Sequence, residues 1–168
     1  MKSSSSKPRG AAFWPALGFA ALAGSRATSG PAFLSQYLSQ QALSPSLASS
    51  PLRFLAKPGA ATALKFLIAG EFVGDKLPSS PNRIVPQQLA TRAASGALVG
   101  ATVYKAKGGS ALSGALVGAL GTVVATYITF YLRKTISEKA NIATSLVGAG
   151  EDALVLGLGS ALARSQAA

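Results

Sequence analysis

The chain has 168 residues, enough for one domain, yet 49% of them are hydrophobic and only 12% are charged, against a usual charged share of about a quarter. The chain has 16 lysines and arginines but only five acidic residues, which gives a net charge of +11. Because the chain has no cysteine and no histidine, disulfide bonds, zinc sites of the Cys/His kind and nucleophiles activated by histidine are excluded.

The first ten residues, MKSSSSKPRG, are polar and basic, and we expect residues 1–10 to be disordered. The apolar run AAFWPALGFAALAG follows at 11–24. One interpretation is a secretory signal peptide that is cut at SRA, residues 25–27. The other is a first membrane helix, bent or broken at Gly30-Pro31. Since 14 residues rise only about 21 Å and the hydrocarbon core is about 30 Å thick, this helix must continue past Arg26 or enter the bilayer without crossing it.

Four more apolar helices follow, separated by two proline-rich loops, the turn KAKGG and a polar connection. They are expected at 61–78, 89–104, 110–133 and 142–163. The segment 110–133 is the clearest membrane span, since it has more than 20 residues and no charge before Arg133.

This pattern predicts an all-α fold, a polytopic helical membrane bundle with four to five transmembrane helices and a glycine-rich central hairpin. Alternation typical of a membrane barrel is missing, and alanine, leucine and glycine outnumber β-branched residues in the apolar runs. A soluble bundle would need a polar face on each helix, and 110–133 has none. We therefore expect one transmembrane helical domain over 11–164 behind the basic N-terminus 1–10.

The basic residues stand in small groups between the apolar blocks, for example at Lys105 and Lys107 and at Arg133 and Lys134. A nucleic-acid-binding protein usually has its lysines and arginines gathered on one face, together with aromatic side chains on which nucleobases stack. Flanking positions instead suit helices that end at a lipid surface. The expected partner is the lipid bilayer, with no nucleic acid, and a homo-oligomer or a membrane-protein partner is left open.

The heptapeptide SGALVGA occurs twice, at 95–101 and at 113–119. It places small residues four positions apart, at Gly96 and Gly100 and again at Gly114 and Gly118. Such residues share one helix face and let another backbone approach closely. The turn between the copies puts them on two antiparallel helices, so we favour packing within one hairpin over a homodimer face.

Several charges fall inside the apolar helices, where each unpaired one costs about 2.5–3.5 kcal/mol on insertion scales. The acids are Glu71, Asp75, Glu151 and Asp152, and the candidate counterions are Arg26, Lys65, Lys76 and Arg92. In one interpretation they are buried ion pairs and helix caps that stabilise the bundle. In the other they surround a polar cavity for an ion, a proton or a small solute. An Arg26–Asp152 pair is one specific expectation.

Enzymatic chemistry has little support in the sequence. Glu71 and Asp75, four residues apart, are the best acid–base candidates, but no phosphate-binding loop of the GxxxxGK[ST] kind exists, and GLGSA at 157–161 is not a dinucleotide fingerprint. We expect no enzyme activity, no cofactor and no metal.

Four stretches of the chain resemble one protein family: GEFVGDKLPSSPNR at 70–83, TRAASGALVGA at 91–101, YLRK at 131–134 and AGEDALVLGLG at 149–159. The family is an uncharacterised bacterial membrane-protein family catalogued as domain of unknown function 4126, and the resemblance covers roughly residues 12–163. It implies a multi-pass membrane protein and supplies no activity. The charged positions of the family map onto Arg26, Glu71, Asp75, Lys76, Glu151 and Asp152.

The expectation is therefore a multi-pass protein of a cell membrane, the bacterial cytoplasmic membrane, that transports or conducts an ion or a small solute through a charged intramembrane site. The alternative is a structural or accessory membrane subunit whose buried charges are only packing ion pairs.

Overall fold

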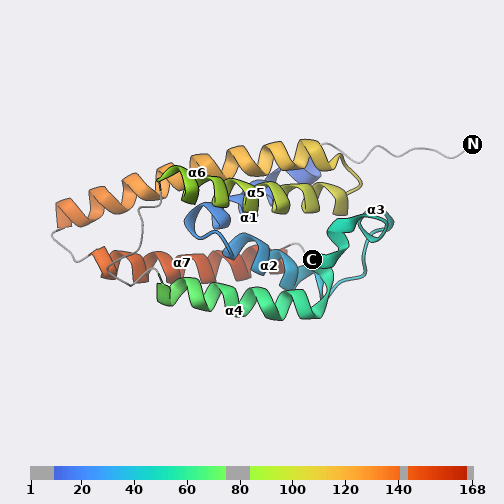
Figure 1. Ribbon diagram of the computed structural model, residues 1–168, viewed down its shortest axis with the longest axis horizontal. Coiled ribbons are helices and arrows are strands. Elements are labelled where there is room, and N and C mark those ends of the chain that lie inside the picture. The colour runs from blue at the N-terminus through green and yellow to red at the C-terminus, as the bar shows by residue number, and fades with distance from the viewer. Residues whose placement is uncertain (1–9, 75–83, 141–143, 166–168) are drawn as a thin grey trace, which may run out of the picture.

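The computed structural model describes residues 10–74, 84–140 and 144–165. These residues form eight helices and no strand (Figure 1), which confirms the all-α prediction. The helices are α1 (Gly10–Ser25), α2 (Ser29–Leu38), α3 (Pro45–Ala48), the 3₁₀ helix η1 (Pro51–Ala56), α4 (Pro58–Gly74), α5 (Pro86–Ala106), α6 (Ala111–Ala140) and α7 (Thr144–Ser165).

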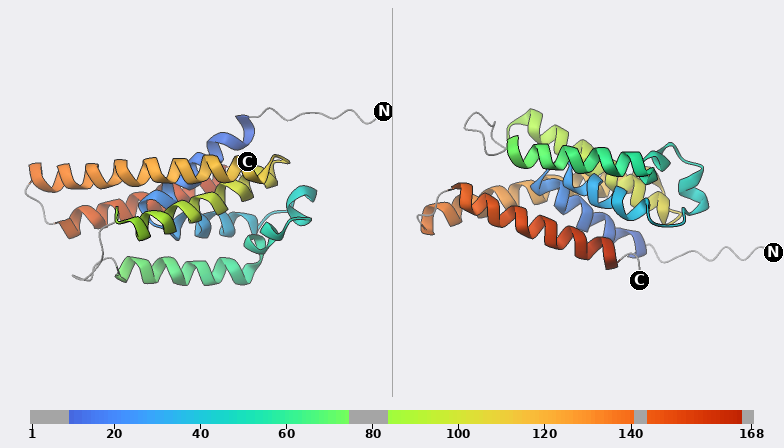
Figure 2. Two further views of the ribbon diagram at one scale, coloured as in Figure 1. Left: turned by 45° about the horizontal axis from the view of Figure 1, so that its top comes forward. Right: turned by 90° about the horizontal axis from the view of Figure 1, so that it is seen from below.

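The first apolar segment is not one bent helix but a hairpin of two helices. The chain leaves α1 after Ser25 and returns along it as α2, so that the Ser29 hydroxyl donates a hydrogen bond to the carbonyl of Leu22. The right-hand view of Figure 2 shows these two blue helices side by side. We call the residues between them, Arg26–Thr28, the hairpin tip.

The expected break at Gly30-Pro31 was misplaced, because both residues lie in the first turn of α2. Proline is tolerated there since its missing N–H would have no partner in the helix. Gly30 is required for another reason: a Cβ on it would lie 2.6 Å from the carbonyl oxygen of Phe19 in α1. The glycine thus allows the two antiparallel helices to touch.

The hairpin lies at the centre of the bundle. On α1, Ala16, Phe19, Ala20 and Ala23 are buried at 0–1% exposure. α5 and α6 form the most extensive helix pair and pack on α1, while α4 and α7 contact α2. Residues 11–25 thus form a central helix of the described bundle.

The four glycines of the repeated heptapeptide face one another across α5 and α6. A Cβ on Gly100 would lie 2.1 Å from the carbonyl oxygen of Gly114, and one on Gly118 would lie 2.0 Å from that of Gly96. The two backbones are therefore in direct contact, and Gly108, with φ +80°, makes the turn between the helices. This arrangement is a packing surface within the chain.

Of the described helices, one is long and apolar enough to cross a membrane, the stretch Ala111–Lys139 of α6. Only 17% of its most apolar window is buried, whereas the core helix of a soluble protein would be mostly covered. Its exposed side includes Leu112, Leu116, Leu120 and Val124. Length and composition thus support one span of the four to five that the sequence predicts.

The glycine contact can be tested with one added methyl group. Gly100→Ala should lower the melting temperature of the detergent-purified protein by roughly 5–10 °C, because overpacking against backbone costs about 3 kcal/mol. Gly157→Ala in α7 is the matched control, since nothing lies within 4 Å of its added Cβ, and should be neutral or slightly stabilising. Equal melting temperatures for Gly100→Ala and wild type would contradict the close contact.

Candidate functional site

The hairpin tip places two helix ends inside the protein. The last carbonyls of α1 and the first amides of α2 have no partners within their own helices, and buried polar groups of this kind are costly unless they are hydrogen-bonded. Arg26 at the tip is only 2% exposed. Side chains from α4, α5 and α6 bind these backbone groups, and Asp152 of α7 binds the side chain of Arg26.

Glu71 of α4 caps the beginning of α2. Its Oε1 accepts a hydrogen bond from the amide of Ala27 at 2.9 Å, and its Oε2 accepts one from the amide of Thr28 at 3.0 Å. The Thr28 hydroxyl also donates to Oε2. A carboxylate at this position satisfies two amides and carries the charge that the positive end of the helix dipole favours.

Arg92 of α5 binds the other kind of helix end, the C-terminal end of α1. Its Nη1 donates to the carbonyl oxygens of Gly24 and Ser25, at 2.8 and 2.7 Å. A cation is favourable there because the C-terminal end of a helix is the negative end of its dipole. Arg92 is 2% exposed, so water does not replace it as a donor.

Arg26 connects the tip to α7 and α4. Its Nε donates to Oδ1 of Asp152 at 2.9 Å, Nη2 forms an ion pair with the same carboxylate, and Nη1 donates to the backbone carbonyl of Glu71 at 3.2 Å. Arg26 is 2% exposed and Asp152 14%. Removing one partner of such a buried pair leaves an uncompensated charge.

Hydroxyl groups complete the site. Thr122 and Thr126 of α6 are fully buried and donate to the carbonyls of Ala20 and Gly24 in α1, at 2.9 and 3.2 Å. Ser95 of α5 donates to the carbonyl of Ala27 at the tip. These bonds hold the hairpin against the α5–α6 pair.

The structure therefore brings three predicted site residues together at the tip: Arg26, Glu71 and Asp152. Asp75 and Lys76 lie outside the described residues, and so does the side chain of Glu151. Arg92, which the sequence analysis proposed only as a candidate counterion, is part of the site.

Sequence reasoning missed the role of the hydroxyl groups. Thr122 and Thr126 continue the row of small residues that begins at Gly114 and Gly118, and that row was the available signal. For Ser95 the sequence offers no comparable signal, because its acceptor is a tip carbonyl far away in the chain.

A cavity of about 510 Å³ with both polar and apolar lining residues lies between α2, α4 and α7, and because of its polar groups we call it the polar vestibule. Its polar lining includes Gln36, Gln40, Gln41, Ser160 and the bases Lys65 and Arg164. Ile68 of α4 and Leu156 of α7 also line it. Glu71 lies three residues beyond Ile68, and Asp152 four residues before Leu156, so the vestibule approaches the tip to within about one helical turn.

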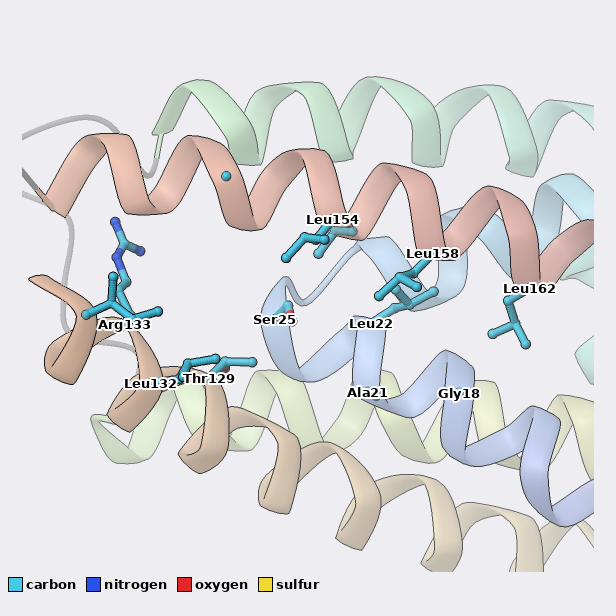
Figure 3. A pocket seen from close by; sticks show the side chains of 13 residues that line it. Gly18, Ala21, Leu22, Ser25, Thr129, Leu132, Arg133, Leu154, Leu158 and Leu162 are labelled. Carbon is cyan, nitrogen blue, oxygen red and sulfur yellow. The ribbon is translucent and has the colours of Figure 1, made fainter. Parts of the chain in front are cut away.

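A larger cavity, of about 1030 Å³, lies between α1, α6 and α7 and is lined mainly by apolar side chains (Figure 3). Ser25, next to the tip, is among its lining residues. The two cavities thus approach the tip from different helices, and the smaller one has the larger share of polar lining. Within the described part of the chain, no three acidic side chains come together as a metal site.

A family model described as "Domain of unknown function (DUF4126)" matches residues 14–164. No curated protein matches the chain, and no solved structure does. The match extends over the hairpin and all four helices that contact its tip.

The Arg26–Asp152 pair predicts non-additive mutations. Asp152→Ala alone should destabilise the protein by about 3–5 kcal/mol, and Asp152→Ala combined with Arg26→Ala should recover about 1–3 kcal/mol of the summed loss. Unfolding by denaturant in detergent measures these values. The exposed pair Lys134–Glu138, at 4.0 Å, serves as the control, and its double mutant should be additive. Additivity at Arg26 and Asp152 as well would contradict a stabilising pair.

Proposed function

The chain belongs to the family of proteins with a domain of unknown function, DUF4126, and on that premise we propose a membrane transport function for it. In this proposal it is a multi-pass protein of the bacterial cytoplasmic membrane that passes an ion or a small polar solute across the bilayer. The observation that carries the proposal is an irregular, charged hairpin tip buried at the centre of a bundle with a lipid-compatible surface.

Helix lengths support a multi-pass arrangement. α5, α6 and α7 have 21, 30 and 22 residues, and about 20 residues cross a hydrocarbon core of about 30 Å. α4, with 17 residues, is at the lower end of the usual range. Exposed apolar side chains such as Phe66 on α4 and Leu154 on α7 suit contact with lipid. These four helices are the proposed full spans.

The α1–α2 hairpin is the proposed re-entrant element. α1, with 16 residues, rises about 24 Å, so its tip would reach past the middle of the bilayer before the chain turns back. At membrane depth, non-helical backbone is tolerated only where protein buries it or where it lines a water-filled cavity. In transporters, interrupted helices of this kind form the sites for ions and substrates.

The polar vestibule is the proposed route to the tip. It carries amide, hydroxyl and basic side chains, and the buried Ile68 lies between Lys65 and Glu71 along α4. An apolar constriction stops water and ions until it widens. In this proposal Ile68 forms such a constriction, and the structure represents a closed state.

The structural alternative also rests on an observation. The four charged side chains described at the tip, Arg26, Glu71, Arg92 and Asp152, each have a hydrogen-bond or ion-pair partner. In a purely structural protein, such fully paired charges would only stabilise the packing of the helices. The two functions differ in whether the barrier between vestibule and tip can open.

Topology separates the proposed arrangement from five full spans. Four spans and one re-entrant hairpin put the N- and C-termini on the same side of the membrane, whereas five spans put them on opposite sides. Reporter domains that are active only in the cytoplasm, fused in turn to each terminus, should therefore give the same response. Opposite responses would contradict the re-entrant hairpin.

Transport is tested in proteoliposomes that contain potassium chloride or glycerol. Ile68→Ala should raise the efflux of the conducted species several-fold because it widens the barrier, and Glu71→Gln and Asp152→Asn should lower it because they alter the tip. Efflux is followed with ion-selective electrodes and, for glycerol, by light scattering. Lys134→Gln, an exposed site remote from the vestibule lining, should behave as wild type. Equal background efflux from empty vesicles, wild type and all variants would favour the scaffold.

A further inference from the structure

Of the described residues that line the polar vestibule, the charged ones are both bases. They are Lys65 of α4 and Arg164 of α7, and both side chains are exposed. In the described part of the chain, neither side chain forms an ion pair or a hydrogen bond. Two positive charges are therefore available to a solute that enters the vestibule.

Neutral hydrogen-bond donors surround these two bases. The lining includes the side-chain amides of Gln36, Gln40 and Gln41 and the hydroxyl group of Ser160. Each amide offers two N–H donors and the hydroxyl offers one, and these can replace part of an anion's water shell. Because an amide can also turn its oxygen towards a cation, the bases decide which sign of charge the vestibule favours. Its volume of about 510 Å³ lies within the usual range for ligand pockets, about 300–1,000 Å³.

The vestibule is lined by stretches of the chain that contain no acid. Its lining residues fall within 32–68 and 156–164. The stretches 1–70, 76–137 and 153–168 have no aspartate or glutamate. The five acids of the chain therefore all lie outside the segments that build the vestibule.

Helix register separates Lys65 from the acids of α4. Glu71 lies six residues beyond Lys65, a rise of about 9 Å, and it is bound to the amides of the hairpin tip. Asp75 comes after the last residue of α4, Gly74. Both acids thus follow Lys65 in the direction of the tip.

The same separation holds on α7. Asp152 lies 12 residues before Arg164, a rise of about 18 Å, and it is paired with Arg26. Glu151 is one residue further away along the helix. Because α4 and α7 run in opposite directions (Figure 1), their acid-bearing ends lie at the same end of the bundle. The end of α6, which carries Glu138, lies there too.

The opposite end of the bundle is basic. It contains η1 and the turn between α5 and α6 (Figure 1), which add Arg53, Lys57, Lys105 and Lys107 and no acid. Charges of one sign along a cleft with low-dielectric walls raise the local concentration of counterions. Pathways for anions accordingly carry lysine and arginine, whereas pathways for cations carry aspartate and glutamate.

We propose that the polar vestibule binds a small anion, such as chloride or phosphate, through Lys65 and Arg164. A small anion is then the species that the protein passes, a step that rests on the transport function proposed above. Binding in the vestibule does not depend on that step. The two parts are tested by separate measurements.

The sign of a diffusion potential shows which ion passes. Phosphatidylcholine vesicles contain the Ile68→Ala protein and hold more potassium chloride inside than outside, and a voltage-sensitive dye reports the potential. The interior should become positive because chloride leaves ahead of potassium. Lys65→Gln together with Arg164→Gln, which we call the vestibule variant, should lower this potential several-fold in the same Ile68→Ala background.

Binding is measured on the detergent-purified full chain, without transport. The excess width of the chloride NMR line reports chloride that exchanges with the protein, and the vestibule variant should reduce it several-fold. The matched control is Lys134→Gln together with Lys139→Gln, which removes two exposed charges from α6, outside the vestibule lining. This control should keep most of the excess width. Since all four side chains are exposed, both double variants should fold.

The two measurements separate the anion site from the transport function. If no protein develops a potential but the vestibule variant alone loses chloride binding, the transport function is wrong and the anion site stands. An interior-negative potential, or equal chloride binding by the vestibule variant and the control, would overturn the proposal. Loss of chloride binding when phosphatidylglycerol is added would also overturn it, because lipid headgroups would then occupy the two bases.

Discussion

The fold depends on satisfying two helix ends that lie inside the protein. Where α1 stops and α2 begins, free carbonyls and amides meet in an environment from which water is largely excluded. Glu71 binds the amides and Arg92 binds the carbonyls, and each charge has the sign that the local helix dipole favours. With Arg26 and Asp152 the tip holds two positive and two negative side chains, so the described cluster is neutral and its charges compensate one another.

Close helix packing makes this arrangement possible. The glycines of α5 and α6 allow backbone contact, which brings Ser95, Thr122 and Thr126 within hydrogen-bond distance of the hairpin. Helices in a bilayer gain little from burying apolar surface against each other, so close contact and shared hydrogen bonds must hold them together. The same rows of small residues therefore serve both the α5–α6 contact and the support of the tip.

Arg26, Glu71 and Asp152 could be predicted as site residues because a charge inside an apolar helix is expensive wherever that helix packs. The Arg26–Asp152 contact could be predicted too, since few opposite charges were available. Helix caps were one predicted role for the buried charges, but the helix ends that Glu71 and Arg92 bind could not be predicted, because those ends exist only where the chain reverses at Ser25–Ser29. Gly30-Pro31 suggested a bend, and only the crossing with Phe19 explains that glycine.

The sequence by itself determined the helical class, the apolar surface of α6, the charges at Arg26, Glu71 and Asp152 and the packing role of the four glycines, since each follows from local composition and spacing. Only the tertiary structure decided that α1 and α2 form a hairpin, that side chains from four helices bind it, and that the polar vestibule and the larger apolar cavity lie between different sets of helices. The physical reason is that these features arise from contacts between residues up to 126 positions apart. The energy of such contacts depends on the whole packed bundle and leaves no periodic signal in any single segment.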